Sequence, residues 1–325
     1  MSQEPLTILP RTMAALHDRD PHSPAQGAAG GPAATRPPRV AESSLQHFLA
    51  RRQGAQPAWL HEEVARRMAE RLPLIRQQPG RVLDWWGEAG GAGELLAQQY
   101  RGARRLMVEP SPGLAPSRWR RLLPWPSRVE TVAEAAVPAQ APVQLVWANM
   151  VLHWIDDLPA LLARWHAAMA VDGFLMVSCF GPDTLRELRA VYQACGWGPA
   201  ASALVDMHDV GDALVQAGFA DPVMDMEVLQ LNWPSAAALR AELRTLGANT
   251  SPQRFAGLRT PRWLARLDAA LDERLRGPDG RLGLSFEVIY GHAFKPAPRL
   301  QAGPRTEVSL ETMRAMLQQR PPPSR

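Results

Sequence analysis

The sequence is poor in cysteine, with only Cys179 and Cys195 among its 325 residues. These two residues provide neither a disulfide framework nor the paired spacing of a zinc site. No two histidines have the H-E-x-x-H spacing of a helical metal site. The sequence therefore predicts a protein of a reducing compartment that holds no metal.

Long apolar runs are also missing. No stretch approaches the roughly 20 apolar residues that cross a bilayer as a helix. The N-terminus, MSQEPLTILPRTMAALHDRD, lacks a basic start followed by an uninterrupted apolar core, as a secretory signal would have. We therefore expect a cytoplasmic protein with no membrane segment.

A strong excess of one charge is absent as well. Lys and Arg number 36 against 32 Asp and Glu, giving a formal net charge of +4. Modules that bind nucleic acid combine clustered basic residues with interleaved aromatics. Here tryptophans such as Trp147 and Trp165 lie among leucines and alanines at core-like positions. The sequence argues against nucleic-acid binding, and its mild positive charge suits an acidic partner.

Composition divides the chain into a central domain and two tails. Residues 1–43 are rich in Ala, Pro and Gly and cannot bury enough apolar surface to order themselves, and 297–325 are similar. The domain at 44–296 alternates helical and strand-like runs, which predicts an α/β fold with a mostly parallel sheet. The Arg-rich stretch 234–281 is too long for a plain connection, so we expect a helical cap insertion there.

The expected elements follow from periodicity and from capping residues. Asp156 or Asp157 should cap one helix, Thr184 with Glu187 fits a capping box, and Gly218 should close a third helix. Strands are expected in RVLDWW, RRLMVEP, VQLVWANMV, GFLMVSCF, VMDMEVLQLNW and LSFEVIYGHAF, and helices in WLHEEVARRMAERLPLI, GELLAQQY, DDLPALLARWHAAM, PDTLRELRAVYQA and DVGDALVQAGF.

The run RVLDWWGEAGGAG, residues 81–93, has the layout of a nucleotide-binding turn. A strand ends in Asp84, glycines follow, and a second strand ends in Glu109, 25 positions later. Glycines let a backbone approach a ligand closely, and an acid at the end of the second strand can accept hydrogen bonds from ribose hydroxyls. No triphosphate loop, G-x-x-x-x-G-K-[ST], occurs. Two interpretations stay open: a nucleoside site, or a plain strand-turn-helix.

Several longer runs point to one family. VQLVWANMVLHWIDDLPALL resembles the fourth strand and following loop of S-adenosylmethionine-dependent methyltransferases. Four further runs resemble the malonyl-acyl-carrier-protein O-methyltransferases of biotin synthesis: FGPDTLRELR, VDMHDVGDALVQAGF, PVMDMEV and FEVIYGHAFK. The resemblance covers about residues 45–297. It implies the class I methyltransferase (Rossmann-like) fold with a seven-stranded sheet, S-adenosylmethionine as cofactor, a malonyl thioester on acyl carrier protein as substrate, and a monomer.

The resemblance also assigns a cofactor site, with one departure from the family's D-x-G-x-G-x-G pattern. Read without gaps, Trp86 and Glu88 replace two of the three glycines, and Trp86 either walls the adenine or fills its pocket. A shift of one residue brings later glycines into use. For the adenine amino group the sequence offers Glu134 or Glu130. The expected cofactor-binding residues are Asp84, Gly87, Gly90, Glu109, Glu134 and Asn149.

On the acceptor side the resemblance implies a carboxylate nucleophile, which needs no general base. Catalysis is then mostly alignment with water excluded, so no catalytic triad is expected. The resemblance places His153 and Trp154 beside the transfer site. Arg186 and Arg189 are one helical turn apart and can share a face that holds the carboxylate, or lie on a solvated face. The arginines of the cap suit an acidic carrier.

Two other functions stay open. The run WLHEEVARRMAERL also resembles methyltransferase-like complex I assembly factors, which would make this an arginine-modifying enzyme that acts on a partner protein. The replacements at Trp86 and Glu88 would instead fit a degenerate, non-catalytic methyltransferase fold that binds a partner. The intact FGPDTLRELR and FEVIYGHAF runs favour the malonyl methyltransferase.

Overall fold

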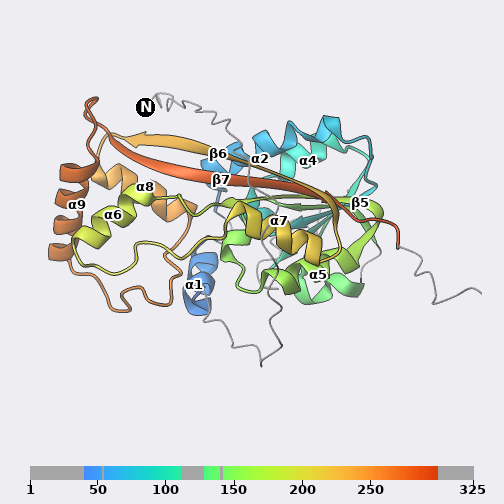
Figure 1. Ribbon diagram of the computed structural model, residues 1–325, viewed down its shortest axis with the longest axis horizontal. Coiled ribbons are helices and arrows are strands. Elements are labelled where there is room, and N and C mark those ends of the chain that lie inside the picture. The colour runs from blue at the N-terminus through green and yellow to red at the C-terminus, as the bar shows by residue number, and fades with distance from the viewer. Residues whose placement is uncertain (1–39, 53–54, 111–127, 140–141, 299–325) are drawn as a thin grey trace, which may run out of the picture.

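The computed structural model describes residues 40–52, 55–110, 128–139 and 142–298 (Figure 1). Of the two expected tails, only 40–43 and 297–298 fall within this part of the chain. In these ranges no helix has both the length and the apolar character to cross a bilayer.

The strands form one seven-stranded sheet in the order β3-β2-β1-β4-β5-β7-β6. β7 runs antiparallel to both of its neighbours, β5 and β6, and the other pairs are parallel. The strand bounds are β1 Arg81–Trp85, β2 Arg104–Glu109, β3 Val129–Ala133, β4 Val143–Ala148, β5 Met169–Phe180, β6 Ala220–Trp233 and β7 Leu282–Phe294. The expected seven-stranded, mostly parallel α/β fold of class I methyltransferases is confirmed.

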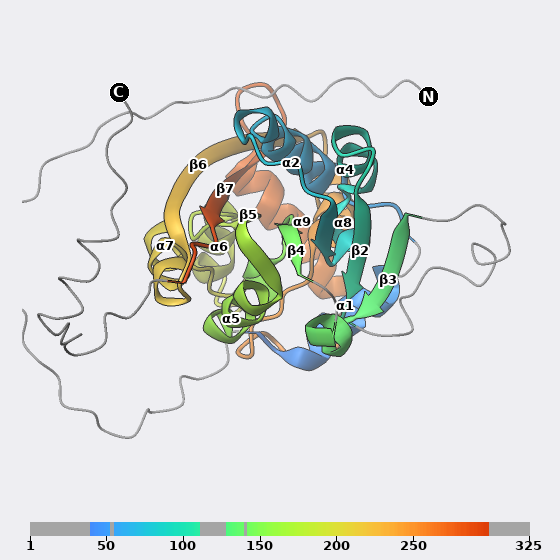
Figure 2. The same ribbon diagram turned by 90° about the vertical axis from the view of Figure 1, so that its right-hand side faces the viewer.

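Helices cover both faces of this sheet (Figure 2). α2 and α4 lie over one face, and α5 and α7 pack together over the other. A separate cluster of buried apolar side chains lies on each face of the sheet. The apolar side chains on one side of each helix pack into the cluster of that face and hold the helix on the sheet. The bounds of these helices are α2 Trp59–Ala69, α4 Gly93–Gln99, α5 Leu158–Ala168 and α7 Met207–Gln216.

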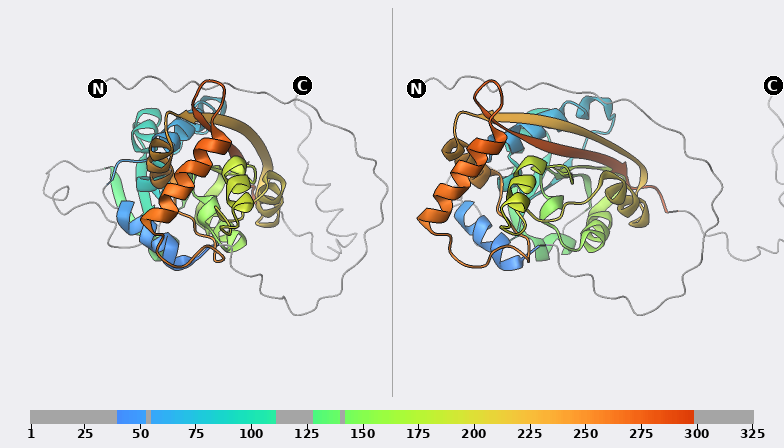
Figure 3. Two further views of the ribbon diagram at one scale, coloured as in Figure 1. Left: turned by 90° about the vertical axis from the view of Figure 1, so that its left-hand side faces the viewer. Right: turned by 60° about the vertical axis from the view of Figure 1, so that its left-hand side comes forward.

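A group of helices covers one end of the sheet. α8 and α9 fall in the expected insertion between β6 and β7, and α9 packs on α6 and β7. Figure 3 shows α9 on the outside of this end, with α1 nearby. The bounds here are α1 Glu42–Arg52, α6 Arg186–Ala194, α8 Ala236–Leu246 and α9 Pro261–Leu275, and the short elements are η1 Leu72–Leu74, α3 Gly87–Gly90, η4 Glu134–Ala139 and η5 Leu152–Trp154.

The helix ends confirm two of the capping expectations and correct one. Asp157 caps α5 by accepting the N–H of Ala160, and Gly218 follows α7 with φ +92°. The capping box at Thr184 and Glu187 is wrong. Its two side chains bond to β7 instead: the Thr184 hydroxyl donates to the Glu287 carbonyl, and Glu187 accepts the Ser285 N–H. These tertiary hydrogen bonds outcompete the local cap.

Candidate active site

The turn after β1 places Trp86 in a backbone conformation that glycine prefers. Trp86 has φ +53° and ψ +48°, the left-handed region, and α3 begins at the next residue. A side chain at such a position costs about 1–2 kcal/mol, a strain that glycine avoids. Trp86 therefore has a backbone conformation that favours glycine, and both readings of the glycine pattern, without gaps or shifted by one residue, stay predictions.

The glycines of α3 let this turn pack closely on the sheet. A Cβ on Gly87 would lie 2.6 Å from Oδ2 of Asp84, and one on Gly90 would lie 3.1 Å from the backbone oxygen of Asn149. Both positions face the ends of strands β1 and β4, so side chains there would push α3 outward.

Two buried acids lie beneath the turn. Glu109 is 3% exposed at the end of β2, and its Oε1 accepts the backbone N–H of Glu88 at 2.9 Å. Burial raises the pKa of Glu109 to about 8, and the nearby carboxylates of Glu88, Asp84 and Glu134 add to the effect. Burial also raises the pKa of Asp84 to about 6, against the opposing charge of Arg105.

These acids fit a nucleoside cofactor that carries hydroxyl and ammonium donors. Oδ2 of Asp84 is buried with no hydrogen-bond partner, and the nearest cation, Nε of Arg105, lies 3.7 Å away. Buried polar atoms are rarely left unpaired without a function. Glu109 at the end of β2 is placed where ribose hydroxyls are bound in such sheets.

The Trp86 indole reaches across the end of the sheet to β3. Its Nε1–H donates to Oε1 of Glu134 at 2.6 Å, and Arg164 binds the other oxygen of that carboxylate at 3.2 Å. The neighbouring Trp85 turns into the protein and meets Trp165 edge to face, with centroids 5.6 Å apart. Glu130, the other acid considered for adenine, is exposed on β3.

Asn149 holds the turn to the rest of the domain. Its amide nitrogen donates to the carbonyls of His61 and Gly90, and its oxygen accepts from the Ser178 hydroxyl at 2.7 Å. Both amide hydrogens are therefore used within the protein, and the side chain is 1% exposed. Asn149 therefore links the turn to α2 and β5 through hydrogen bonds, and a contact between Asn149 and the cofactor stays a prediction.

His153 and Trp154 lie in η5 at the end of β4 and line a cavity of about 200 Å³. The backbone N–H of Phe180 approaches Nδ1 of His153 at 3.5 Å, which assigns the proton of the neutral ring to Nε2. That Nε2 is buried without a partner. Burial, helped by His61, holds the pKa of His153 well below its usual range. His153 is therefore a neutral ring in the wall of the cavity.

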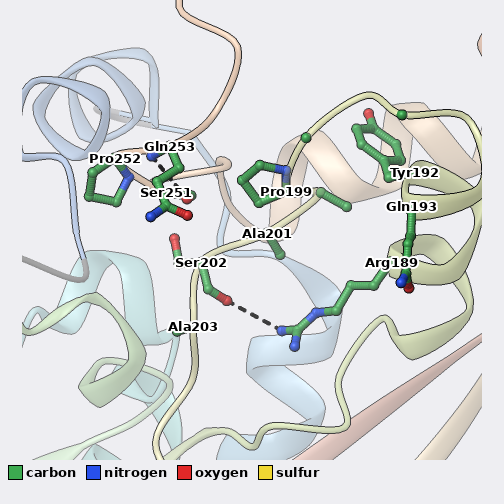
Figure 4. A pocket seen from close by; sticks show the side chains of 13 residues that line it. Arg189, Tyr192, Gln193, Pro199, Ala201, Ser202, Ala203, Ser251, Pro252 and Gln253 are labelled. Carbon is green, nitrogen blue, oxygen red and sulfur yellow. Dashed lines mark hydrogen bonds between the residues drawn. The ribbon is translucent and has the colours of Figure 1, made fainter.

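The structure separates the two arginines of α6. Arg189 lines the cavity and donates to the backbone carbonyls of Pro182 and Ser202, while its Nε is buried without a partner (Figure 4). Arg186 is exposed and forms ion pairs with Asp183 and Glu187. Arg189 therefore contributes a guanidinium to the cavity wall, within reach of the charge of Asp183, whereas Arg186 is paired at the surface.

Arg189 also lines a wider groove of about 820 Å³. Tyr192 and residues 200–202 line both the groove and the cavity, so the two lie next to each other. Figure 4 shows the side chains that line the groove.

His61 is a buried histidine near the site that was not among the residues expected from the sequence. This residue of α2 is 2% exposed, its Nδ1 lies 3.0 Å from the Ala89 carbonyl, and its Nε2 is buried without a partner. Burial lowers its pKa to about 4. His61 lies beside Leu60 and Val64 on the buried stripe of α2, and a polar residue on an apolar stripe is the signal that could have found it.

Comparison with known proteins identifies the family of this chain. A family described as a methyltransferase domain matches residues 58–249. Three curated relatives carry the name malonyl-[acyl-carrier protein] O-methyltransferase. The protein of Gallionella capsiferriformans is 38% identical over 75% of this chain and 86% of its own length. That of Laribacter hongkongensis is 40% identical over 74% and 84%, and that of Halorhodospira halophila 39% over 73% and 81%. Among solved structures, the YcgJ protein of Bacillus subtilis aligns with a TM-score of 0.49 and 10% identity, covering 73% of this chain and 100% of that one.

Proposed function

This chain belongs to the malonyl-[acyl-carrier protein] O-methyltransferase family, and we propose that it methylates the free carboxylate of a malonyl thioester on acyl carrier protein, in biotin synthesis, with S-adenosylmethionine as the methyl donor. The observation that carries this proposal is that a cation, Arg189, and a neutral histidine, His153, line one cavity. That pair is suited to hold an organic anion.

The cofactor supplies an electrophilic methyl group on a sulfonium sulfur. Glu109 would accept its ribose hydroxyls, Glu134 its adenine amino group, and Asp84 lies below the turn as an acceptor for a cationic donor. The acceptor carboxylate is itself the nucleophile, so the protein has no proton to remove. Its task is to align the two groups and exclude water.

Arg189 would bind one end of the acceptor carboxylate, and the Nε2–H of His153 would orient it. Both side chains line a cavity whose other walls include Trp154, Phe180 and Phe286. The apolar walls raise the strength of each charge-assisted hydrogen bond by keeping water out. They also leave the nucleophilic oxygen poorly hydrated, which favours attack.

A basic rim beside the groove fits an acidic carrier. His47, Arg51, Arg254 and Arg259 line a depression of about 530 Å³, which meets the acceptor groove at Tyr192 and Pro199. Arg240, by contrast, is engaged by Asp268 through two hydrogen bonds of 2.7 and 3.0 Å. We propose that this rim, rather than the whole cap, receives the carrier by charge complementarity.

Rescue of a biotin-requiring bacterial strain that lacks its malonyl-carrier methyltransferase tests the proposal. The wild-type gene should restore growth without biotin, and the Arg186→Met variant should do so too. The Arg189→Met variant, produced at the same level, should not. Failure of the wild-type protein, folded and able to bind the cofactor, would point to another acceptor, as an arginine-modifying enzyme would have. If the wild-type protein neither restores growth nor binds the cofactor, the degenerate, non-catalytic fold is favoured. The buried position of Trp86 is compatible with that outcome.

A further inference from the structure

We infer that the Trp86 side chain is a gate over the nucleoside site, closed in this structure by its hydrogen bond to Glu134 and opened when the cofactor binds. The inference rests on the cofactor of the proposed function. The gate concerns how the cofactor enters its site, whereas the family resemblance concerns only the residues that bind it.

The sheet order fixes what the indole covers. β2 lies between β1 and β3, and neighbouring strands are about 4.8 Å apart. Trp86 leaves the end of β1, while its Nε1–H meets Glu134, which directly follows β3, at 2.6 Å. The bond therefore joins the turn after β1 to the segment after β3, and the strand between them, β2, ends in Glu109. Ligands of such sheets bind beyond these strand ends, with the ribose on the acid of β2.

The indole and a nucleoside thus compete for the same place and the same partner. Trp86 is 4% exposed, so its side chain is packed against its neighbours and, among the described residues, no open pocket lies beside it. Its N–H uses the Glu134 oxygen that an adenine amino group would use. Both cannot be satisfied with Trp86 in this position.

The closed state is also one that a ligand can reverse. The indole gains a charge-assisted hydrogen bond to a carboxylate that Arg164 holds in place. The contacts of the cofactor with Glu109 and Glu134 would outweigh this one hydrogen bond.

Titration calorimetry with S-adenosylhomocysteine tests the gate. Trp86→Phe keeps a ring but loses the N–H, and Trp86→Gly removes the ring at a position that suits glycine. We expect the Phe variant to bind about tenfold more tightly than wild type, since a hydrogen bond to a charged group typically contributes that much or more. The Gly variant should bind at least as tightly as the Phe variant.

A matched control removes an indole–carboxylate bond elsewhere. Trp59 of α2 hydrogen-bonds the side chain of Glu242 outside the site, and Trp59→Phe should leave the affinity unchanged. Circular dichroism confirms that each variant is folded. Weaker or unchanged binding by both Trp86 variants, with wild type binding normally, would overturn the gate and leave the cofactor intact. No binding by any protein, Trp86→Gly included, would overturn the cofactor assignment and the gate together.

Indole ¹⁵N–¹H spectra give a second readout that does not depend on affinity. The Trp86 cross-peak is the one missing from the Trp86→Phe spectrum. Saturating S-adenosylhomocysteine should move this cross-peak and speed the exchange of its proton with water, because the bond to Glu134 is broken. A Trp86 cross-peak that stays in place at saturation would contradict the gate.

Discussion

The rings of Trp86 and Trp154 lie with their centroids 5.9 Å apart and their planes at 41°. Trp86 belongs to the cofactor turn and Trp154 to the wall of the acceptor cavity, where its ring also meets His153 at 5.0 Å. This contact joins the turn proposed to bind the cofactor to the wall of the cavity proposed for the acceptor. A movement of Trp86 would reach the acceptor side through this contact.

Loss of the Glu109 carboxylate should abolish cofactor binding. Glu109→Ala removes an acceptor for the ribose hydroxyls, and two hydrogen bonds to a charged group together contribute more than about a hundredfold in affinity. Calorimetry with S-adenosylhomocysteine measures this loss. Glu94→Ala, which removes an exposed acid of α4, is the control and should bind as wild type does. Equal affinities for all three proteins would exclude Glu109 from the site.

Cofactor affinity should fall as the pH drops below about 8. The pKa of Glu109 in the free protein is raised to about 8, so this carboxyl is protonated at neutral pH. A cofactor that binds the ionised form must then release a proton, which weakens binding by up to about tenfold per pH unit below 8 and not above it. Calorimetry in buffers of different ionisation enthalpy measures the proton directly. An affinity that does not change between pH 6.5 and 8.5 would contradict a buried, protonated Glu109.

The two arginines of α6 should differ in their effect on the acceptor. Arg189→Met removes the guanidinium from the cavity wall, so kcat/KM for malonyl-acyl carrier protein should fall by about 10- to 100-fold. Arg186→Met breaks only exposed ion pairs, which contribute little, and should change kcat/KM by less than about twofold. Steady-state kinetics with varied carrier distinguish them. The reverse order would place the anion site on the outer face of α6.

The methyl-transfer step should not depend on a histidine that titrates near neutrality. The pKa of His153 is held well below 6.5 by burial, so the ring is already neutral at pH 6 and gains no proton there. With both substrates saturating, kcat should therefore be flat between about pH 6 and 8. An inflection near pH 6.5 that disappears in His153→Gln would show an exposed, titrating ring instead.

Reversal of charge on the basic rim should weaken carrier binding without altering the chemistry. The double variant Arg254→Glu and Arg259→Glu should raise KM for the carrier while kcat is unchanged, because both side chains lie outside the cavity. The effect should shrink as salt rises, since screening already reduces the attraction in wild type. A KM equal to that of wild type at low salt would remove the rim as the docking surface.

Most of the strands and the covering helices could be predicted from local pattern, because apolar runs and helical stripes report burial directly, but the strand order could not. RVLDWW, VQLVWANMV and LSFEVIYGHAF all fall on strands of the sheet. What failed depended on contacts between distant residues. The Thr184 cap lost to a bond with Glu287, 103 positions away, and the Trp86–Glu134 bond joins residues 48 apart. No spacing rule reveals such pairs.

Helix α1 shows the same limit. The boundary at residue 44 places most of Glu42–Arg52 inside the domain but does not predict a helix there. Its buried side chains Leu45, Phe48 and Leu49 have helical spacing, but this stripe is short, and the packing of Phe48 edge to face on Trp154 at 4.8 Å stabilises the helix.

The most direct test is the intact mass of the carrier protein after incubation with this enzyme and S-adenosylmethionine. We expect malonyl-acyl carrier protein to gain the mass of one methylene group, as a methyl ester. Acetyl-acyl carrier protein, which has no free carboxylate, should gain nothing. An unchanged mass of malonyl-acyl carrier protein, with a folded enzyme that binds S-adenosylhomocysteine, would contradict methylation of the malonyl carboxylate.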